Sequence, residues 1–258
     1  MSAAPPAFFM KKRGLFMEKI ITYETLRNFA YSNDALCHTP IRGIVLTFNG
    51  LGFSTMVWDD ESPIDQEYAS QGIIHVIPYY NPWCWMNRQA VDYVDEIVDV
   101  LFGRYALEDT IPIIATGGSM GGLCALVYSR YAKRTPTACL ANCPVCDLPY
   151  HYTERPDLPH TLYSAFATGA GTFEAALRSA SPIHLVDELP DIPYYIFHCE
   201  EDKAVNKERH SDVFVKALSS EHTVEYYTIP GRGHCDLSPE MHTLFRQKIL
   251  ESIEGTGK

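Results

Sequence analysis

The chain has 258 residues, of which 46% are hydrophobic and 12% aromatic, enough to fill a sizeable core and inconsistent with intrinsic disorder. Its formal net charge of -11 repels phosphate backbones and anionic lipid surfaces, so neither nucleic acid nor a membrane is expected as a partner. The first 16 residues lack the order of basic and apolar segments of a signal peptide. We expect one globular domain over residues 19–258, preceded by a disordered N-terminal extension, 1–18.

Patterns of apolar residues predict strands and helices that alternate along the chain. The N-terminal half predicts, in order, a half-exposed edge hairpin (19–30), a buried strand (41–48), a short helix (63–71), a second buried strand (73–80) and a long amphipathic helix (88–105). The C-terminal half predicts a strand (111–116), a helix (123–133), a strand (137–142), an irregular insertion (143–190), a strand (192–199), a helix (206–219), a strand (223–230) and a closing helix (238–253). Such alternation predicts a mainly parallel, twisted sheet with helices on both faces.

The insertion at 143–190 is the least regular part of the sequence. It contains prolines, two short helical pieces and a Gly-Ala-Gly hinge at 169–171. We interpret it as a small helical cap over one edge of the sheet.

A serine in a glycine-rich turn connects a predicted strand to a predicted helix. Residues 117–121 read Gly-Gly-Ser-Met-Gly and match the G-x-S-x-G motif of the α/β-hydrolase fold, which requires this strand–turn–helix context. The serine of such a turn has a strained positive φ, and the residues two positions away must be small, as Gly117 and Gly121 are. The motif predicts Ser119 as a nucleophile, with an ordinary glycine turn as the alternative. A nucleotide-binding loop is disfavoured because no G-x-x-x-x-G-K-[ST] pattern is present.

A serine hydroxyl needs a base to activate it and a third group to hold that base. In this fold the chain order is serine, acid, histidine. His234 lies in a Gly-Arg-Gly-His loop between the last predicted strand and helix, and is the predicted base. Three carboxylates, Glu200, Glu201 and Asp202, follow the preceding strand; Asp202 is the predicted acid and Glu201 the fallback. The alternatives are a solvated acidic turn and a loop histidine without a catalytic task.

An oxyanion hole needs two donors aimed at the substrate carbonyl oxygen. The backbone amide of Met120, directly after the nucleophile, is the first expected donor. The turn after strand 41–48 is expected to supply the second, from the amide of Leu51 with the side chain of Asn49 as a further donor. A plain Asn-Gly turn is the alternative.

These motifs resemble the prolyl oligopeptidase family of serine peptidases, specifically its α/β-hydrolase catalytic domain. The resemblance spans roughly residues 40–250 and rests on GGSMGG at 117–122, on the segment from Ser181 through a strand to Asp202, and on GRGH at 231–234. It implies the roles already given to Ser119, Asp202 and His234.

The sequence departs from the family pattern in three places. About 40 residues precede the first predicted buried strand, where family peptidases commonly carry a large β-propeller. Asn49 stands where a histidine or tyrosine is common, and Cys199 where a glycine is common. Peptide specificity therefore stays open, and small esters and amides are equally suitable substrates.

Aromatic residues follow the strand at 73–80 and should lie on the active-site side of the sheet. Tyr79, Tyr80, Trp83 and Trp85 are candidates to line a substrate pocket, with packing under the cap as the alternative.

Eight cysteines fall mainly in apolar or motif-bearing segments, and a chain of this size does not need disulfides, so we expect reduced thiols in a cytoplasmic protein. Cys143 and Cys146 have the C-x-x-C spacing of zinc and redox sites, but a second pair is missing and packing is favoured. Cys235, beside the predicted base, is expected to be an inert thiol, with sensitivity of the site to oxidation as the alternative. We expect no metal and no cofactor.

The sequence therefore predicts a hydrolase that cleaves an ester, an amide or a short peptide through an acyl-enzyme on Ser119. The alternative from another class is a non-catalytic protein of this fold that binds a small molecule. Association into a homodimer stays open, since nothing in the sequence decides it.

Overall fold

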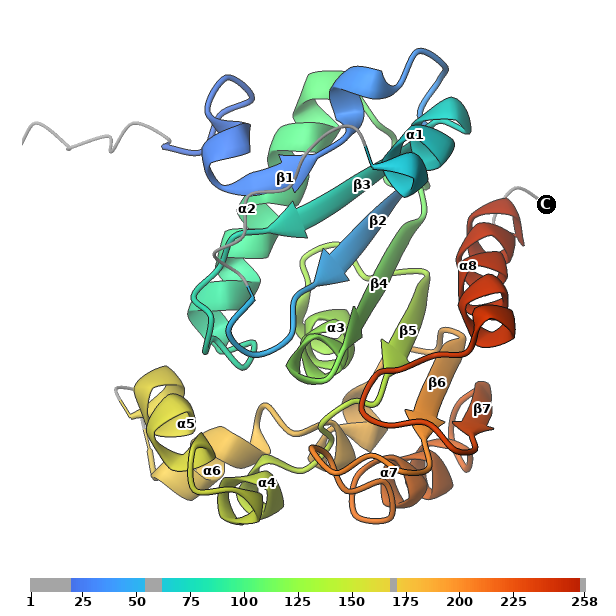
Figure 1. Cartoon of the computed structure of the whole chain (residues 1–258). Helices are drawn as coiled ribbons and strands as arrows, with labels where there is room; N and C mark the ends of the chain where they lie inside the picture. Colours follow the sequence, from blue (N-terminus) through green and yellow to red (C-terminus); the bar gives the residue numbers. More distant parts are fainter. Residues whose placement is uncertain (1–19, 54–61, 168–170, 256–258) are drawn as a thin grey trace, which may run out of the picture.

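The computed structural model of the chain describes residues 20–53, 62–167 and 171–255 (Figure 1). The predicted N-terminal extension, 1–18, and residues 169 and 170 of the predicted hinge lie outside these ranges. In the part of the chain that is described, no helix combines the length and apolar character that crossing a bilayer requires.

A single seven-stranded sheet forms the centre of the molecule, with the strand order β1-β3-β2-β4-β5-β6-β7 (Figure 1). Only β1 is antiparallel to its neighbour, β3; all other neighbouring strands are parallel. The strands are β1 (Ala30–Ser32), β2 (Gly43–Phe48), β3 (Ile73–Pro78), β4 (Ile113–Gly118), β5 (Ala138–Asn142), β6 (Tyr194–Cys199) and β7 (Val224–Ile229). The predicted buried strands are therefore confirmed within two residues at nearly every boundary.

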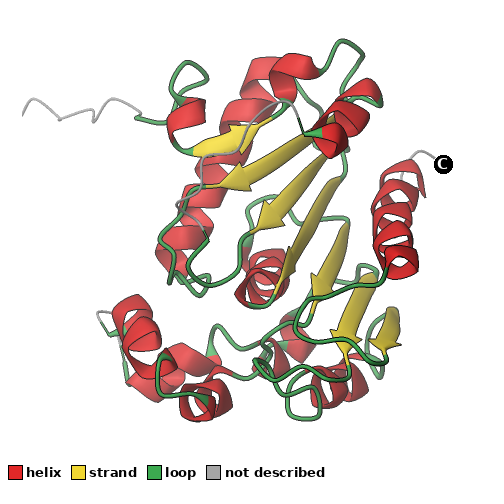
Figure 2. Ribbon diagram, in the orientation of Figure 1, coloured by secondary structure: helices red, strands yellow, loops and turns green. Residues whose placement is uncertain are grey.

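Helices cover both faces of this sheet (Figure 2). Apolar side chains of β2 alternate between two cores: Leu46 packs in the larger one, with α2, α3 and α7, and Val45 in a smaller one, with α1 and α8. The helices are α1 (Pro63–Ser70), α2 (Arg88–Tyr105), α3 (Met120–Tyr131), α7 (Ser211–Leu218) and α8 (Pro239–Glu254). A strand covered on both faces needs apolar residues on both, which explains the continuous apolar runs in the sequence. This is the layered sheet of the α/β-hydrolase fold.

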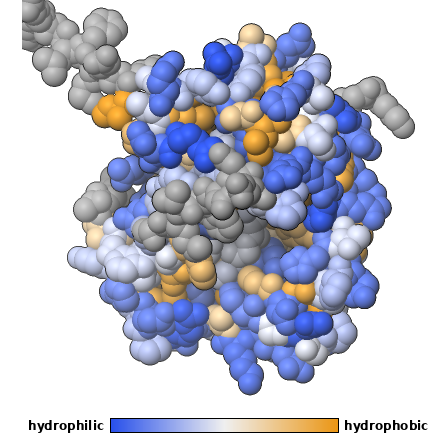
Figure 3. Space-filling model, turned by 45° about the horizontal axis from the view of Figure 1, so that its top comes forward, coloured by the Kyte–Doolittle hydropathy of each residue, from blue (hydrophilic) through white to orange (hydrophobic). Residues whose placement is uncertain are grey.

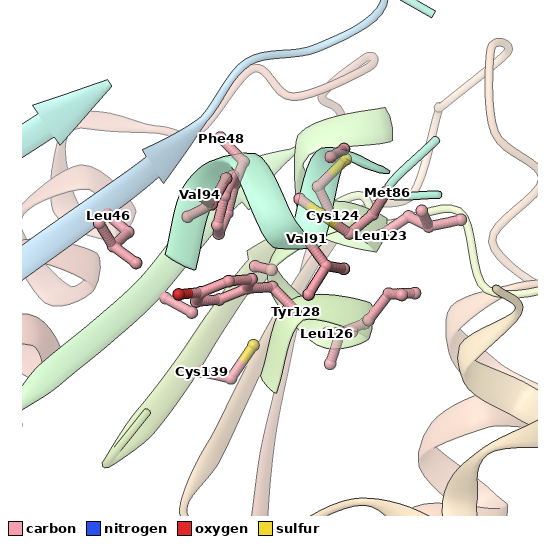
Figure 4. Close-up of a cluster of buried hydrophobic side chains, with 14 of the residues drawn as sticks. Leu46, Phe48, Met86, Val91, Val94, Leu123, Cys124, Leu126, Tyr128 and Cys139 are labelled. Atoms are coloured by element: carbon pink, nitrogen blue, oxygen red, sulfur yellow. The ribbon is translucent and has the colours of Figure 1, made fainter. Parts of the chain in front are cut away.

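The larger core lies between the sheet and helices α2 and α3 (Figure 4). The ring of Phe48 on β2 packs 5.4 Å from that of Tyr128 on α3, measured between ring centroids. Helix α2 begins where the Asn87 side chain accepts a hydrogen bond from the Ala90 amide (3.0 Å) and ends at Ala106 with φ 49°. Both bounds match the range predicted from the apolar stripe, because a capping asparagine and a left-handed residue stop the helix at its two ends.

Three short helices form the cap: α4 (Leu148–Glu154), α5 (Leu158–Phe166) and α6 (Phe173–Arg178). The sequence predicted two such pieces. In Figure 1 they lie together on the side to which the strand arrows point. The indole N–H of Trp85 donates to Thr161 Oγ1 (3.1 Å), and the Asn87 side chain donates to the Ala165 carbonyl (2.9 Å). The cap is therefore fastened through α5 to the segment that follows β3.

The hairpin predicted at 19–30 does not form over residues 20–30. The hydroxyl of Thr25 donates to the Ile20 carbonyl (2.7 Å) and accepts from the Thr22 amide (2.9 Å), so a turn replaces the first arm. A 3-10 helix, Leu26–Asn28, follows, and only β1 joins the sheet, at its edge beside β3. Side-chain hydrogen bonds of threonine to nearby backbone groups compete with strand pairing here.

The helix predicted from residue 206 begins at Ser211 instead. The preceding His210 has φ -104° and ψ -84°, which is not helical. Its Nδ1 accepts a hydrogen bond from the Cys146 amide (3.0 Å), which ties the residue to the start of the cap and holds it out of the helix.

Most of the surface in the view of Figure 3 is hydrophilic, and its hydrophobic residues form small separate groups. Large hydrophobic side chains that are well exposed include Trp83 and Tyr163, which lie beside and on the cap helix α5.

The backbones of β2 and α3 touch where α3 leaves β4. A Cβ atom on Gly121 would lie 2.0 Å from the carbonyl oxygen of Phe48, and one on Gly117 would lie 2.5 Å from the backbone of Gly121. Neither contact can be relieved by a side-chain rotation, because all the atoms involved belong to backbone.

We expect Gly121→Ala to lower the free energy of unfolding by more than about 3 kcal/mol, or to prevent folding, because the strand and helix must separate to admit the methyl group. The matched control is Gly103→Ala on α2, where a Cβ meets nothing within 4 Å. It should leave stability unchanged or raise it by up to about 1 kcal/mol. Urea unfolding followed by circular dichroism measures both, and equal midpoints for the two variants would contradict the prediction.

Candidate active site

Ser119 occupies the turn between β4 and α3 in a conformation that side chains rarely adopt. Its φ is 59° and its ψ is -124°. The turn is held by its backbone: the Ser119 amide donates to the Asn142 carbonyl (2.9 Å), and its carbonyl accepts from the amides of Gly122 (3.0 Å) and Leu123 (3.2 Å). The side-chain hydroxyl has no hydrogen bond to any residue that the structure describes. A strained, partly exposed serine with an unoccupied hydroxyl is what a nucleophile elbow presents to a substrate.

The turn after β2 lies against this elbow. A Cβ built on Gly50 would be 3.9 Å from the Cβ of Ser119 and 3.7 Å from the carbonyl of Gly118. The carbonyl of Asn49 accepts from the Tyr80 hydroxyl (3.2 Å), which fixes the start of the turn. The amide of Met120, as the first residue of α3, has no acceptor within its own helix. The structure thus brings the predicted oxyanion donors to the same end of the sheet as Ser119.

Asn49 differs from the other predicted donors in its surroundings. Its side-chain Nδ2 is buried and finds no acceptor among the residues that the structure describes. A buried donor without a partner is costly, so such groups are often found where a ligand supplies the acceptor.

Asp202 and His234 are joined directly. Asp202 follows β6, His234 follows the adjacent β7, and Nδ1 of the histidine lies 2.6 Å from Oδ2 of the carboxylate. The Asp202 side chain has no exposed surface, whereas 28% of the His234 side chain is exposed. The other oxygen of Asp202 accepts from the amides of Ala204 (2.8 Å) and Val205 (3.0 Å). The neighbouring carboxylates 200 and 201 are exposed, and of the three only Asp202 is hydrogen-bonded to His234.

The sequence of this chain matches the model of one protein family, the prolyl oligopeptidase family, over residues 86–251. The matched region is more than half of the chain and contains Ser119, Asp202 and His234. The chain belongs to the prolyl oligopeptidase family.

Solved structures of this fold align with most of the chain. A puromycin hydrolase superposes with a TM-score of 0.69 at 17% identity, over 85% of this chain and 34% of its own. An acylaminoacyl peptidase of Pyrococcus horikoshii superposes with a TM-score of 0.67 at 16% sequence identity. The match covers 84% of this chain and 38% of the peptidase. Esterase B of Lactobacillus rhamnosis superposes with a TM-score of 0.64 at 15% sequence identity. The match covers 85% of this chain and 78% of the esterase. The chain spans about a third of the length of the puromycin hydrolase and of the acylaminoacyl peptidase. Comparison with curated proteins gives no match.

Both members of the Asp202–His234 pair favour their charged forms. Burial opposes ionisation of Asp202, but hydrogen bonds from His198 and His234 outweigh it, and the pKa of the carboxyl lies well below 3.8. Burial also opposes protonation of His234, but the hydrogen bond and charge of Asp202 prevail and raise its pKa from 6.5 to about 9. The hydrogen bond and charge of Cys143 add to this rise, and hydrogen bonding to Cys235 and burial raise the pKa of the Cys143 thiol itself.

His198 contacts this pair through Asp202, and the sequence analysis did not identify it. It is fully buried on β6, and its Nε2 lies 3.2 Å from the Val205 carbonyl and 3.3 Å from Oδ2 of Asp202. Because both neighbours of Nε2 are acceptors, Nε2 carries the proton, and Nδ1 accepts from the Ser211 hydroxyl (2.6 Å). His198 thus donates to the carboxylate that holds His234. Its place at the end of the strand before the acid was the only signal in the sequence.

No hydrogen bond joins His234 to Ser119 in the described part of the chain. Instead, Nε2 of His234 lies 3.7 Å from Sγ of Cys235. The two loops are nevertheless adjacent, because the Ser119 amide (2.9 Å) and the Cys235 thiol (3.6 Å) share the carbonyl of Asn142 as acceptor. Hydrogen bonds of catalytic groups often form only when substrate binds.

The four predicted aromatic residues divide into two kinds. Tyr80 and Trp85 are at most 5% exposed. The Tyr80 hydroxyl donates to the Asn49 carbonyl and the Trp85 indole N–H to Thr161, so both side chains act in packing. Tyr79, Tyr80 and the 39%-exposed Trp83 line a cavity of about 300 Å³ between α2 and the cap helix α5, and of these Tyr79 and Trp83 are the more exposed. Ser119 is not among the residues that line this cavity.

The eight cysteines are all free thiols. Cys143 and Cys146 do not face each other: the thiol of Cys146 donates to the Pro144 carbonyl (3.6 Å), while Sγ of Cys143 accepts from the amide of Cys235 (3.4 Å). The C-x-x-C spacing is thus not a site in itself, and Cys143 belongs with the residues around His234.

The raised pKa of His234 can be tested without any substrate. Its imidazole should titrate near pH 9 by nuclear magnetic resonance, instead of near 6.5. In Asp202→Asn the charge is gone and burial remains, so the midpoint should fall to 6.5 or below. Glu201→Gln removes an exposed carboxylate next to Asp202 and should leave it unchanged. A wild-type midpoint at or below 6.5 would contradict the electrostatic argument.

Proposed function

We propose that the chain hydrolyses an ester, amide or short-peptide bond of a small substrate through an acyl-enzyme on Ser119. The single observation that carries this proposal is the 2.6 Å hydrogen bond between Asp202 and His234, adjacent to a serine on a strained turn. A carboxylate, an imidazole and a hydroxyl in this order form the template of serine hydrolases on unrelated folds.

In the proposed mechanism, Ser119 Oγ attacks the substrate carbonyl carbon while His234 Nε2 takes the hydroxyl proton. The same proton then passes to the departing alcohol or amine. Asp202 holds the proton on Nδ1, so that Nε2 presents its lone pair in the neutral imidazole, the form that increases as the pH rises toward the pKa of about 9, and it stabilises the imidazolium that forms. Water repeats the sequence on the acyl-enzyme and releases the acid. A turn of the imidazole from Cys235 toward the serine accompanies substrate binding.

The developing oxyanion is stabilised, in this proposal, by the Met120 amide at the start of α3. The Leu51 amide and the Asn49 side chain, from the turn that packs on the elbow, are the second source of donors. Positive charge at the N-terminus of α3 adds to their effect. The buried Nδ2 of Asn49, which lacks an acceptor among the described residues, supports this role.

We assign substrate contact to Tyr79 and Trp83, the more exposed aromatic residues of the cavity beside α5, and packing to the buried Tyr80 and Trp85. An aromatic wall of this kind suits an apolar or aromatic group on the substrate. The similar solved structures include a puromycin hydrolase and an esterase, so amide and ester substrates are both suitable. Parallel assays of p-nitrophenyl esters and aminoacyl amides separate the two.

Labelling with a fluorophosphonate tests the nucleophile directly. The wild-type protein should be labelled, and Ser119→Ala should not, because the probe bonds only to an activated serine. Asp202→Asn should lower kcat/KM by about 1,000-fold or more, since the imidazole loses its orientation and its countercharge. Glu201→Gln is the matched control and should retain activity. Labelling that survives Ser119→Ala would refute the assignment.

A non-catalytic binding protein is the second candidate function. The observation that favours it is the absence of a hydrogen bond between Ser119 and His234 in the described structure, where Nε2 faces a thiol instead. This candidate predicts no labelling and no turnover on any ester or amide.

We also propose a reducing compartment, such as the cytoplasm, as the site of action. All eight cysteines are free, and two of them, Cys143 and Cys235, lie close together beside His234. An oxidising compartment would favour cross-links at these positions.

A further inference from the structure

The geometry points to a binding site for a soft divalent metal ion, Zn²⁺ or Cd²⁺, made by Cys143, His234 and Cys235. We propose that an ion held there switches the enzyme off by occupying the nitrogen that must accept the serine proton. The binding of the ion is independent of the proposed function, whereas the switching rests on it.

The three side chains lie close to the separations that a metal ion needs. Sγ of Cys143, a ring nitrogen of His234 and Sγ of Cys235 are all within 4.8 Å of one another. Sγ of Cys235 and Nε2 of His234 are 3.7 Å apart. A tetrahedral zinc ion, with Zn–S of about 2.3 Å and Zn–N of about 2.0 Å, places its ligand atoms about 3.5 to 3.8 Å apart. Small side-chain movements would therefore complete three corners of the tetrahedron.

The histidine is presented as metal-binding histidines usually are. A ligating imidazole commonly donates its other N–H to a carboxylate, which fixes the tautomer and directs the lone pair. Nδ1 of His234 donates to the fully buried Asp202 at 2.6 Å, so the lone pair of the neutral imidazole is on Nε2, which lies beside the Cys235 thiol. The arrangement that prepares a general base therefore also prepares a metal ligand.

Two backbone amides donate to the sulfur of Cys143, whose thiol is otherwise kept protonated by Cys235 and burial. Its Sγ accepts hydrogen bonds from the amides of Cys199 and Cys235, each at 3.4 Å. Amide donors of this kind stabilise the thiolate that forms when a metal binds. Because the pKa of His234 is raised to about 9, binding near neutral pH exchanges one Zn²⁺ for three protons, two from the thiols and one from Nε2 of the imidazolium. The partly exposed faces of His234 and Cys235 provide the route by which the ion enters.

Two other clusters of metal-ligating side chains within the described residues do not qualify. In the first, His210 Nδ1 accepts from the Cys146 (3.0 Å) and Asp147 (3.2 Å) amides, so its Nε2 carries the proton that it donates to Glu154. In the second, which contains Cys143 and Asp202, both ring nitrogens of His198 are engaged in hydrogen bonds. The first cluster contains no thiol, and the second offers one thiol and no free ring nitrogen, so among the three only the cluster of Cys143, His234 and Cys235 offers a soft ion two thiols and an imidazole.

Titration of the reduced, metal-free protein with Cd²⁺ tests the site by its thiolate-to-cadmium absorption band. We expect one equivalent of Cd²⁺ to saturate the band in the wild type. Cys143→Ser and Cys235→Ser should each weaken binding at least tenfold and diminish the band. Cys139→Ser, which changes a buried thiol on β5 outside this cluster, is the control and should match the wild type. Circular dichroism verifies that each variant is folded.

Inhibition by Zn²⁺ is followed through fluorophosphonate labelling, with each variant compared to its own metal-free rate. Labelling of the wild type should stop when one equivalent is bound and return after chelation with EDTA, while the two serine variants should need at least tenfold more zinc. Absence of the cadmium band, or equal bands in wild type and both variants, would overturn the metal site. If metal-free wild type is not labelled at all, the proposed function fails, while the cadmium titration still decides the site.

Discussion

Helix α3 begins so close to the end of β2 that only glycine fits at the crossing, and the candidate site depends on this approach. A Cβ on Gly121 would overlap the Phe48 carbonyl at 2.0 Å. The crossing forces Ser119 into a positive φ between strand and helix, and it brings the turn after β2 against the serine. The strain in the serine backbone is therefore compensated by the packing of two buried elements, each of which belongs to the main core.

Around this fixed serine, a second constraint governs the histidine. The carboxylate of Asp202 has no exposed surface, yet four donors satisfy it: two backbone amides, His198 and His234. A buried charge persists only when it is paired in this way. Its field holds a proton on Nδ1 of the histidine and leaves the lone pair on Nε2. In the two proposals above, this lone pair accepts either the proton of the Ser119 hydroxyl or a metal ion bound by Cys143 and Cys235.

The cap and the acid loop are mechanically connected. Glu154, at the end of α4, accepts from the Asn206 amide (3.2 Å) and from His210 Nε2 (2.8 Å), both of which follow Asp202 in the chain. Burial opposes ionisation of Glu154, but hydrogen bonds from His151 and His210 lower its pKa to about 2, so the link persists over a wide pH range. Helix α5 is also hydrogen-bonded to the segment after β3. The cap is therefore attached both to the loop that carries Asp202 and to the segment after β3.

Local features of the sequence were sufficient to predict the strands, the long helix α2 and the turn that carries Ser119. The glycines at 117 and 121 specify the elbow at Ser119, and a capping asparagine with an apolar stripe specifies α2, because backbone conformation and helical periodicity act over a few residues. The packing around His234 was not predictable in the same way. Cys143 and Cys235 are 92 residues apart and meet only because β5, β6 and β7 are neighbours in the sheet. Side chains so distant in sequence are brought together by strand order, which tertiary structure alone decides.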